Sequence, residues 1–163
     1  MTPIPPEVAC TVEWFSRIYL AGIPVLLRTK DTSFLSFVCV VAATDALAGY
    51  RYDPNVGNRF SKFVKDYFPC AYAPHADKLY ILRCRLLHNF SPAHFTLTHA
   101  SPSSHLQTSP IGDTVLSDGE FFSGMKSAAE KYFAELQSSA TLQAKMIARL
   151  NNLSEGGAIH VSA

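Results

Sequence analysis

The chain has 163 residues, with 14 basic and 13 acidic side chains and a formal net charge of +1. Hydrophobic residues make up 48% of it and charged residues 17%. Disordered chains are poorer in apolar residues and richer in charge, and an architectural DNA-binding protein needs a large positive excess. The composition excludes both classes and predicts one globular domain over residues 1–163.

The cysteines and the apolar runs predict the cellular setting. Cys10, Cys39, Cys70 and Cys84 form no CxxC pair, which excludes a zinc knuckle or a thioredoxin-like site. The first ten residues lack the basic and apolar regions of a secretory signal. The most apolar run, 34–48, is too short and too polar for a membrane span. We therefore expect a cytoplasmic protein with reduced thiols and no membrane contact.

Apolar periodicity predicts four helices in the first half of the chain. The first covers 8–22 and ends at Gly22. The second, 33–50, is capped by Asp31 or Thr32 and is apolar almost all round, which is typical of the central helix of a bundle. The third covers about 58–67, and the fourth runs from about 75 to 89 with Pro74 in its first turn.

The second half of the chain changes character. Residues 94–99 alternate polar and apolar side chains, which predicts a strand, and a second strand around 104–108 would complete a small antiparallel hairpin. Ser117 and Glu120 have the spacing of a capping box at the start of the next helix. A last helix follows at 141–152, and we expect the termini, 1–8 and 155–163, to be loosely ordered. The fold class is mainly α, with about five to six helices and a hairpin after the fourth.

The fourth helix holds the most informative pattern, because Arg83, Arg85 and His88 lie among apolar residues. Long charged side chains are rarely buried without a partner, so these groups must reach solvent or be paired. Five helical steps turn the chain by about 140°, so Arg83 and His88 do not share one face. A second copy of the helix across a two-fold axis is one way to bring them together.

The segment Arg83-Cys84-Arg85-Leu86-Leu87-His88 has the form R-x4-H, within a longer run LY-x-LRC-x-LLH-x-F. With Thr44-Asp45 on the apolar second helix, it resembles the HEPN superfamily of helical-bundle proteins over about residues 31–150. The resemblance implies a homodimer whose shared cleft is a ribonuclease site that needs no metal or other cofactor. It also implies RNA as substrate and, by association with toxins, an antitoxin-like partner.

In that scheme the catalytic residues are Arg83, His88 and Asp45. A histidine can exchange a proton with the ribose 2′-hydroxyl or the leaving oxygen, and an arginine can hold the phosphate. Active members often have Asn, Asp or His directly after the arginine, whereas this chain has Cys84, a poor hydrogen-bonding group.

Further substrate contacts are expected from Arg85 and Asn89 on the same helix and from Arg59 and Lys62 on the third. Arg59 and Lys62 belong to a basic cluster with Arg51 and Lys65, near Tyr50, Tyr52 and Tyr67, that could follow an RNA backbone. The alternative is a solvated helix face. No metal site is expected, because His94 and His99 would lie on opposite faces of a strand.

A structural interpretation of the R-x4-H segment remains open beside the catalytic one. His88 could interact with the helix dipole at the C-terminus of its helix, and Arg83 could pair with Asp45 inside the bundle. The chain would then be a non-catalytic dimeric helical module that binds a protein partner or a small nucleotide.

Overall fold

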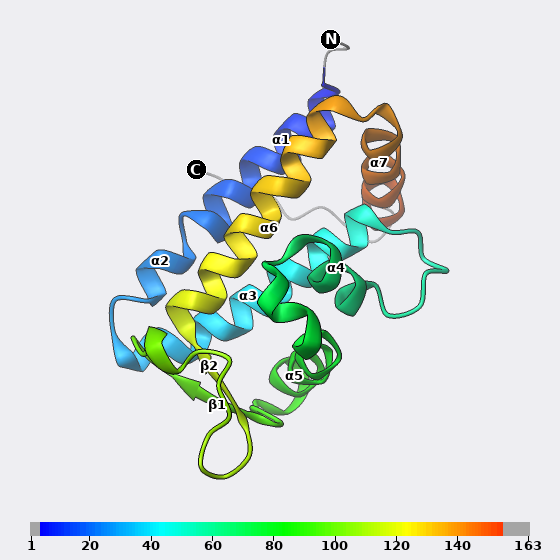
Figure 1. Cartoon of the computed structure of the whole chain (residues 1–163). Helices are drawn as coiled ribbons and strands as arrows, with labels where there is room; N and C mark the ends of the chain where they lie inside the picture. Colours follow the sequence, from blue (N-terminus) through cyan, green and yellow to red (C-terminus); the bar gives the residue numbers. More distant parts are fainter. Residues whose placement is uncertain (1–3, 155–163) are drawn as a thin grey trace.

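Two long helices, α3 (Lys30–Arg51) and α6 (Asp118–Ser138), pack against each other through the centre of the molecule (Figure 1). This arrangement is seen in a computed structural model, which describes residues 4–154. The remaining helices are α1 (Pro6–Phe15), a π-helical turn (Ser16–Leu20), α2 (Ile23–Leu26), α4 (Arg59–Tyr67), a 3-10 segment (Cys70–His75), α5 (Ala76–Asn89), a 3-10 turn (Pro102–Ser104) and α7 (Ala140–Ser154). The strands are β1 (Phe95–Thr98) and β2 (Thr114–Ser117). The mainly helical class with a small β element is confirmed.

The helix α3 is the axis of the bundle, because it contacts α2, α4, α5, α6 and α7. Phe37, Val41 and Leu47 are almost inaccessible to solvent and belong to the main apolar core. The helix has 22 residues, more than the run 34–48, and by length and composition alone it could cross a membrane, a test that a buried core helix also passes. Packing on several sides also explains its apolar composition.

The expected cap of this helix does not form. Thr29 is the N-cap, and its backbone is extended. The hydroxyl of Thr32 instead donates to the carbonyl oxygen of Leu26 at 2.6 Å. That bond ties the start of α3 back to α2, and both Asp31 and Thr32 lie inside the first turn of α3 rather than at its N-cap.

The two strands pair in parallel, with Phe95 opposite Thr114 and Thr98 opposite Ser117. The antiparallel hairpin was therefore wrong, and the second strand lies at 114–117 rather than around 104–108. Parallel strands need a long crossover connection, and residues 99–113 supply it. A single antiparallel bridge between Thr108 and Thr114 is the nearest feature to the expected hairpin.

Asp118 anchors this β segment to the bundle. Its carboxylate is 2% exposed and accepts hydrogen bonds from Ser33 Oγ at 2.7 Å, His99 Nδ1 at 2.6 Å, Ala100 N at 3.1 Å and Gly119 N at 2.7 Å. Burial alone raises the pKa of Asp118, but these donors outweigh it and hold the pKa below its usual value. One carboxylate thus joins α3, the end of β1 and the start of α6.

The capping box expected at Ser117 and Glu120 is also absent. No hydrogen bond from the helix reaches the Ser117 hydroxyl, which accepts instead from the backbone N–H of Ser101 at 3.3 Å. Asp118, one residue later, takes over the role of anchoring the helix start.

A second polar chain fixes the 3-10 segment before α5. The backbone N–H of Ser117 donates to His105 Nδ1 at 3.1 Å, so the ring proton lies on Nε2, which is 2.9 Å from the Tyr72 hydroxyl. Tyr72 in turn donates to the carbonyl oxygen of Glu120 at 2.9 Å. A Cβ atom at Gly124 would lie 2.8 Å from the Tyr72 ring, so this close approach requires glycine.

The expectation for the termini falls partly outside the described residues. Residues 1–3 and 155–163 are not described. Within the expected loose N-terminal stretch, Pro6–Val8 form the first turn of α1, and Val8 is 1% exposed in the core.

Replacing the anchoring carboxylate tests this account of the fold. The variant Asp118→Ala should lower the free energy of unfolding by about 3 kcal/mol, because it leaves several buried donors without an acceptor. Urea denaturation measures the loss. Asp113→Ala removes a nearby carboxylate for which no side-chain hydrogen bond or ion pair is found within residues 4–154. A similar, small effect of both substitutions would show that Asp118 is not an anchor.

Candidate functional site

Three helices place the polar residues of the candidate site. The helix α5 buries Leu79, Leu82 and Leu86, and this face holds it in the bundle. Arg83 lies at the edge of the same face and is directed towards α3, where Asp45 occupies a partly exposed position. The third contributor is Arg59, the first residue of α4.

Arg83 and Asp45 form an ion pair, with Nη2 and Oδ2 2.7 Å apart and side chains 24% and 40% exposed. Nη1 of Arg83 lies 3.9 Å from the Cys84 sulfur, and Nε is buried without a hydrogen-bond partner. Burial lowers the pKa of Arg83, but the hydrogen bond and charge of Asp45 raise it above its usual value. The pairing of Arg83 with Asp45 is therefore confirmed, and the guanidinium stays charged.

A cavity of about 160 Å³ lies beside this ion pair. Its walls are Asp45, Gly57, Asn58, Arg59, Phe60, Tyr80 and Arg83. Two guanidinium groups thus face one carboxylate, which leaves one positive charge in excess. We call this cavity the Arg59–Arg83 pocket.

Arg59 makes the excess charge available to a ligand. Within residues 4–154 no ion pair to Arg59 is found, and its Nη1 atom is buried without a hydrogen-bond partner. It also lies at a helix N-terminus, where the helix dipole disfavours a cation by about 0.3–1 kcal/mol. An oxyanion in the pocket would accept a hydrogen bond from Nη1 of Arg59 and compensate its charge at the helix N-terminus. The arrangement is therefore suited to a phosphate or a carboxylate.

The other expected site residues of α5 lie elsewhere. His88, Arg85 and Asn89 are exposed and do not line the Arg59–Arg83 pocket. His88 is about 140° around the helix from Arg83, as the five-residue spacing dictates. One copy of the chain therefore brings Arg83, Asp45 and Arg59 together and leaves the histidine apart from them.

Most of the expected basic cluster is neutralised by acidic neighbours. Lys62 pairs with Asp66 at 2.9 Å and lies 5.2 Å from the Tyr52 ring centre. Lys65 pairs with Asp77 at 3.2 Å. These contacts match the alternative of a solvated helix face.

Two of the three tyrosines near that cluster, Tyr52 and Tyr67, have structural roles. Tyr52 donates to Asp66 at 2.5 Å, and both Tyr52 and Tyr67 are buried. Tyr67 donates to Glu135 at 2.5 Å, and burial together with this hydrogen bond raises the pKa of Tyr67 to about 12. Neither ring is free to stack on a base.

Sequence reasoning missed Tyr80, whose exposed ring lines the Arg59–Arg83 pocket. The ring lies 6.3 Å from that of Phe60, centre to centre. Its spacing of three from Arg83 was the available signal, because residues three apart on a helix are neighbours.

No group of three His, Cys, Asp or Glu side chains within residues 4–154 could hold a metal ion. Two of the histidines have bonding partners in the fold, since His99 binds Asp118 and His105 binds Tyr72.

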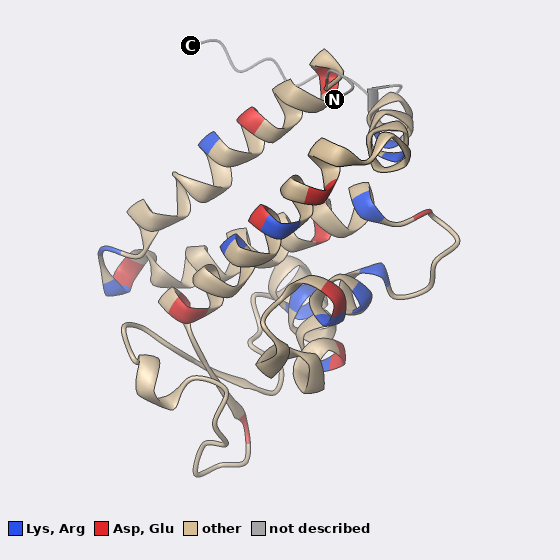
Figure 2. Cartoon of the chain, turned by 45° about the horizontal axis from the view of Figure 1, so that its top comes forward, with Lys and Arg blue, Asp and Glu red and all other residues tan. Residues whose placement is uncertain are grey.

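Figure 2 shows blue segments close together over α4 and α5, whereas the β segment is almost free of charge.

No family model matches the chain, and neither a curated protein nor a solved structure shows a significant match to it. The resemblance to the HEPN superfamily therefore rests on the residues of the R-x4-H segment and remains a prediction.

A double-mutant cycle tests whether the Arg83–Asp45 pair is retained for stability. Because both side chains are partly exposed, Arg83→Ala and Asp45→Ala should show a coupling of only about 0.5–1 kcal/mol in urea denaturation. The exposed pair Lys62–Asp66 is the matched control. A coupling above about 3 kcal/mol would identify a structural lock rather than a binding group.

Proposed function

We propose that this chain is an RNA-binding protein of HEPN-like type, which acts as a homodimer and holds a backbone phosphate in the Arg59–Arg83 pocket. The supporting observation is the pair of guanidinium groups that face a single carboxylate in one cavity. Guanidinium groups bind phosphate oxygens through two parallel hydrogen bonds. Asp45 orients Arg83 and leaves the charge of Arg59 for the ligand.

The size of the pocket favours a polymer over a free small molecule. About 160 Å³ admits little more than a phosphate group, so the sugar and base of a nucleotide must lie outside. The exposed ring of Tyr80 is at the pocket wall, where a base could stack on it. A net charge of +1 means that the attraction for RNA is local to this site.

Binding without cleavage is the function that the geometry supports best. A general acid or base must lie within hydrogen-bond reach of the proton it transfers. His88 is exposed on another face of α5 from Arg83, so cleavage would need a histidine from a second copy. Cys84, which follows the arginine, is a weak substitute for the polar residues found there in active members.

An exposed apolar row on α5 supports the homodimer. It consists of Ile81, Cys84 and Leu87, of which Ile81 is 41% and Leu87 37% exposed while Cys84 is partly buried, and Phe90, which ends the helix, is 69% exposed. Phe90 has φ 52°, a left-handed conformation that is costly for a bulky residue. The ring lies 6.4 Å from that of Phe34, centre to centre, and the rest of it is apolar surface that a partner could cover.

The spacing of the row favours a second copy as that partner. Its members follow every three residues, so each step turns by about 60° around the helix, and Cys84 and Leu87 lie in the middle of the stretch that ends at Phe90. An antiparallel two-fold pair of α5 helices centred between these two residues would place Cys84 opposite Leu87 of the other copy.

The same symmetry determines where the polar groups lie. A two-fold axis of this kind keeps each edge of α5 beside the same edge of its copy. Both Arg83 side chains would then line one edge of the contact and both His88 side chains the other. Two Arg59–Arg83 pockets on one edge suit a single RNA strand, and the separation from His88 again favours binding over cleavage.

The cytoplasmic location, the absence of a membrane role and an antitoxin-like partner remain predictions from the sequence. A non-catalytic module that binds a protein partner or small nucleotide through the same α5 face is the alternative to RNA binding.

An RNA-binding assay tests the proposed function. A fluorescently labelled single-stranded RNA in EDTA should bind the wild-type chain and stay intact, as anisotropy and gel analysis would show. Arg83→Ala and Arg59→Ala should each weaken binding by about tenfold, since each removes a charge-assisted contact. Arg28→Ala, at an exposed position distant in sequence from the pocket, is the control.

Two results would contradict the proposal. Equal affinity of wild type, Arg83→Ala and Arg59→Ala would show that the pocket does not hold RNA. Cleavage by the wild-type chain that His88→Ala abolishes would show a nuclease instead of binding alone. Circular dichroism of each variant separates these results from unfolding.

The dimer is tested by molar mass in solution. The wild-type chain should have about twice the 17.9 kDa mass of one copy, and Leu87→Asp should reduce it to that of a monomer, because a charge in an apolar contact is unfavourable. Ile111→Asp, at a loop position that is 79% exposed, should stay dimeric. Under mild oxidation, Leu87→Cys should link to Cys84 of the other copy. A wild-type monomer would contradict the proposed dimer.

A further inference from the structure

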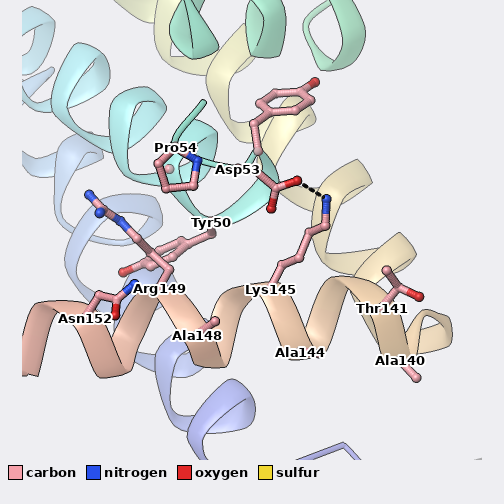
Figure 3. A pocket seen from close by; sticks show the side chains of 12 residues that line it. Tyr50, Asp53, Pro54, Ala140, Thr141, Ala144, Lys145, Ala148, Arg149 and Asn152 are labelled. Carbon is pink, nitrogen blue, oxygen red and sulfur yellow. Dashed lines mark hydrogen bonds and ion pairs between the residues drawn. The ribbon is translucent and has the colours of Figure 1, made fainter. Parts of the chain in front are cut away.

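A second and larger cleft lies between α7 and the end of α3 with the loop that follows it. Its volume is about 590 Å³, within the range of about 300–1,000 Å³ that is typical of small-molecule sites. Figure 3 shows Tyr50, Arg149 and Asn152 at one end and the ion pair of Lys145 with Asp53 at the other. No residue of the Arg59–Arg83 pocket lines it.

The charges in this cleft are unbalanced. Lys145 Nζ lies 2.8 Å from Asp53 Oδ2, so these two charges compensate each other. Arg149 is partly buried, and no ion pair or hydrogen bond to it is found within residues 4–154. One guanidinium therefore remains available at the opposite end.

Arg149 is held against the helix α3 rather than extended into water. A Cβ atom at Gly49 would lie 3.6 Å from Arg149 Nε, which is van der Waals contact. Burial raises the pKa of the Tyr50 phenol, and the nearby charge of Arg149 opposes that rise. The guanidinium, the Tyr50 hydroxyl and the Asn152 amide thus supply hydrogen-bond donors at one end of the cleft.

The walls between the two ends are mostly apolar. Ala144 and Ala148 lie one turn apart on the exposed face of α7, and Pro54 lies across from them. The small side chains leave a shallow, flat surface on which an aromatic ring could lie.

We infer that this cleft binds a small organic oxyanion: a carboxylate or a phosphate monoester carried on a flat apolar body. The oxyanion would lie on Arg149, Tyr50 and Asn152, and the body would cover Ala144 and Ala148. Charge complementarity supports an anion, because Arg149 is the uncompensated charge in the cleft. The inference is independent of the proposed RNA binding, since neither Arg59 nor Arg83 takes part.

Three probes with the same ring system test the inference and distinguish the two kinds of oxyanion: 2-naphthoate, 2-naphthyl phosphate and the uncharged 2-naphthamide. In calorimetric titrations of the full chain, at least one oxyanion should bind with a Kd below about 1 mM and about tenfold more tightly than the amide. The methyl resonances of Ala144 and Ala148 should shift on binding.

Matched variants locate the site. Arg149→Gln should weaken the oxyanion by about tenfold, and Ala148→Trp should abolish binding because it fills the cleft. Arg28→Gln and Ala134→Trp change exposed residues that do not line the cleft and should bind as the wild type does. Thermal unfolding checks that each variant is folded.

The inference is overturned if neither oxyanion binds below about 1 mM, if the amide binds as tightly as both, or if Arg149→Gln has no effect. Tighter binding of the carboxylate or of the phosphate identifies the natural class of ligand.

Discussion

The burial of α3 is the constraint on which the rest of the molecule depends. A helix packed by five others must be apolar on most of its surface. Its polar groups are either hydrogen-bonded in the interior, as Ser33, Ser36 and Thr44 are, or lie where neighbouring helices leave a gap. Asp45 lies in such a gap beside α5, and the ion pair with Arg83 compensates its charge there. The Arg59–Arg83 pocket forms at this point because α4 begins beside it.

Both cavities of functional interest border the C-terminal half of α3. Asp45 lines the smaller one, and Gly49 and Tyr50, about one turn later, line the larger. The loop after α3 also lines both cavities, since Pro54 borders the larger cleft and Gly57 borders the Arg59–Arg83 pocket. Helix ends and loops offer concave surface that the interior of a bundle cannot, which explains why both sites gather here.

Local patterns in the sequence were sufficient for the longer helices, whereas the helix expected at 8–22 ends at Phe15 and is followed by a π-helical turn and the short α2, which were not predicted. The spacing of Leu79, Leu82 and Leu86 predicted α5 to within a residue. The angle of about 140° between Arg83 and His88 around that helix already indicated that the two side chains of one chain lie apart. The alternation over 94–99 predicted β1, but the position of β2 and the parallel pairing could not be predicted in this way. The β segment is joined to the bundle through the carboxylate of Asp118, whose donors Ser33 and His99 are distant from it in the sequence.

The residues of the candidate site also differ in whether the sequence alone could predict them. Asp45 and Arg83 could be paired from the sequence because each is a charged residue in an apolar helix, and Arg59 was identified by its charge. Lys62 looked equivalent to Arg59, and only the fold shows that Asp66 neutralises it. Tyr80 was missed because an aromatic residue on a helix normally belongs to the core.

The salt dependence of RNA binding tests the central claim most directly, because it counts phosphate contacts. For single strands the slope of log K against log salt concentration is about −0.7 per contact. If the Arg59–Arg83 pocket holds a phosphate, Arg83→Ala should make this slope shallower by about 0.7, and Arg28→Ala should leave it unchanged. An identical slope for wild type and Arg83→Ala would contradict the account.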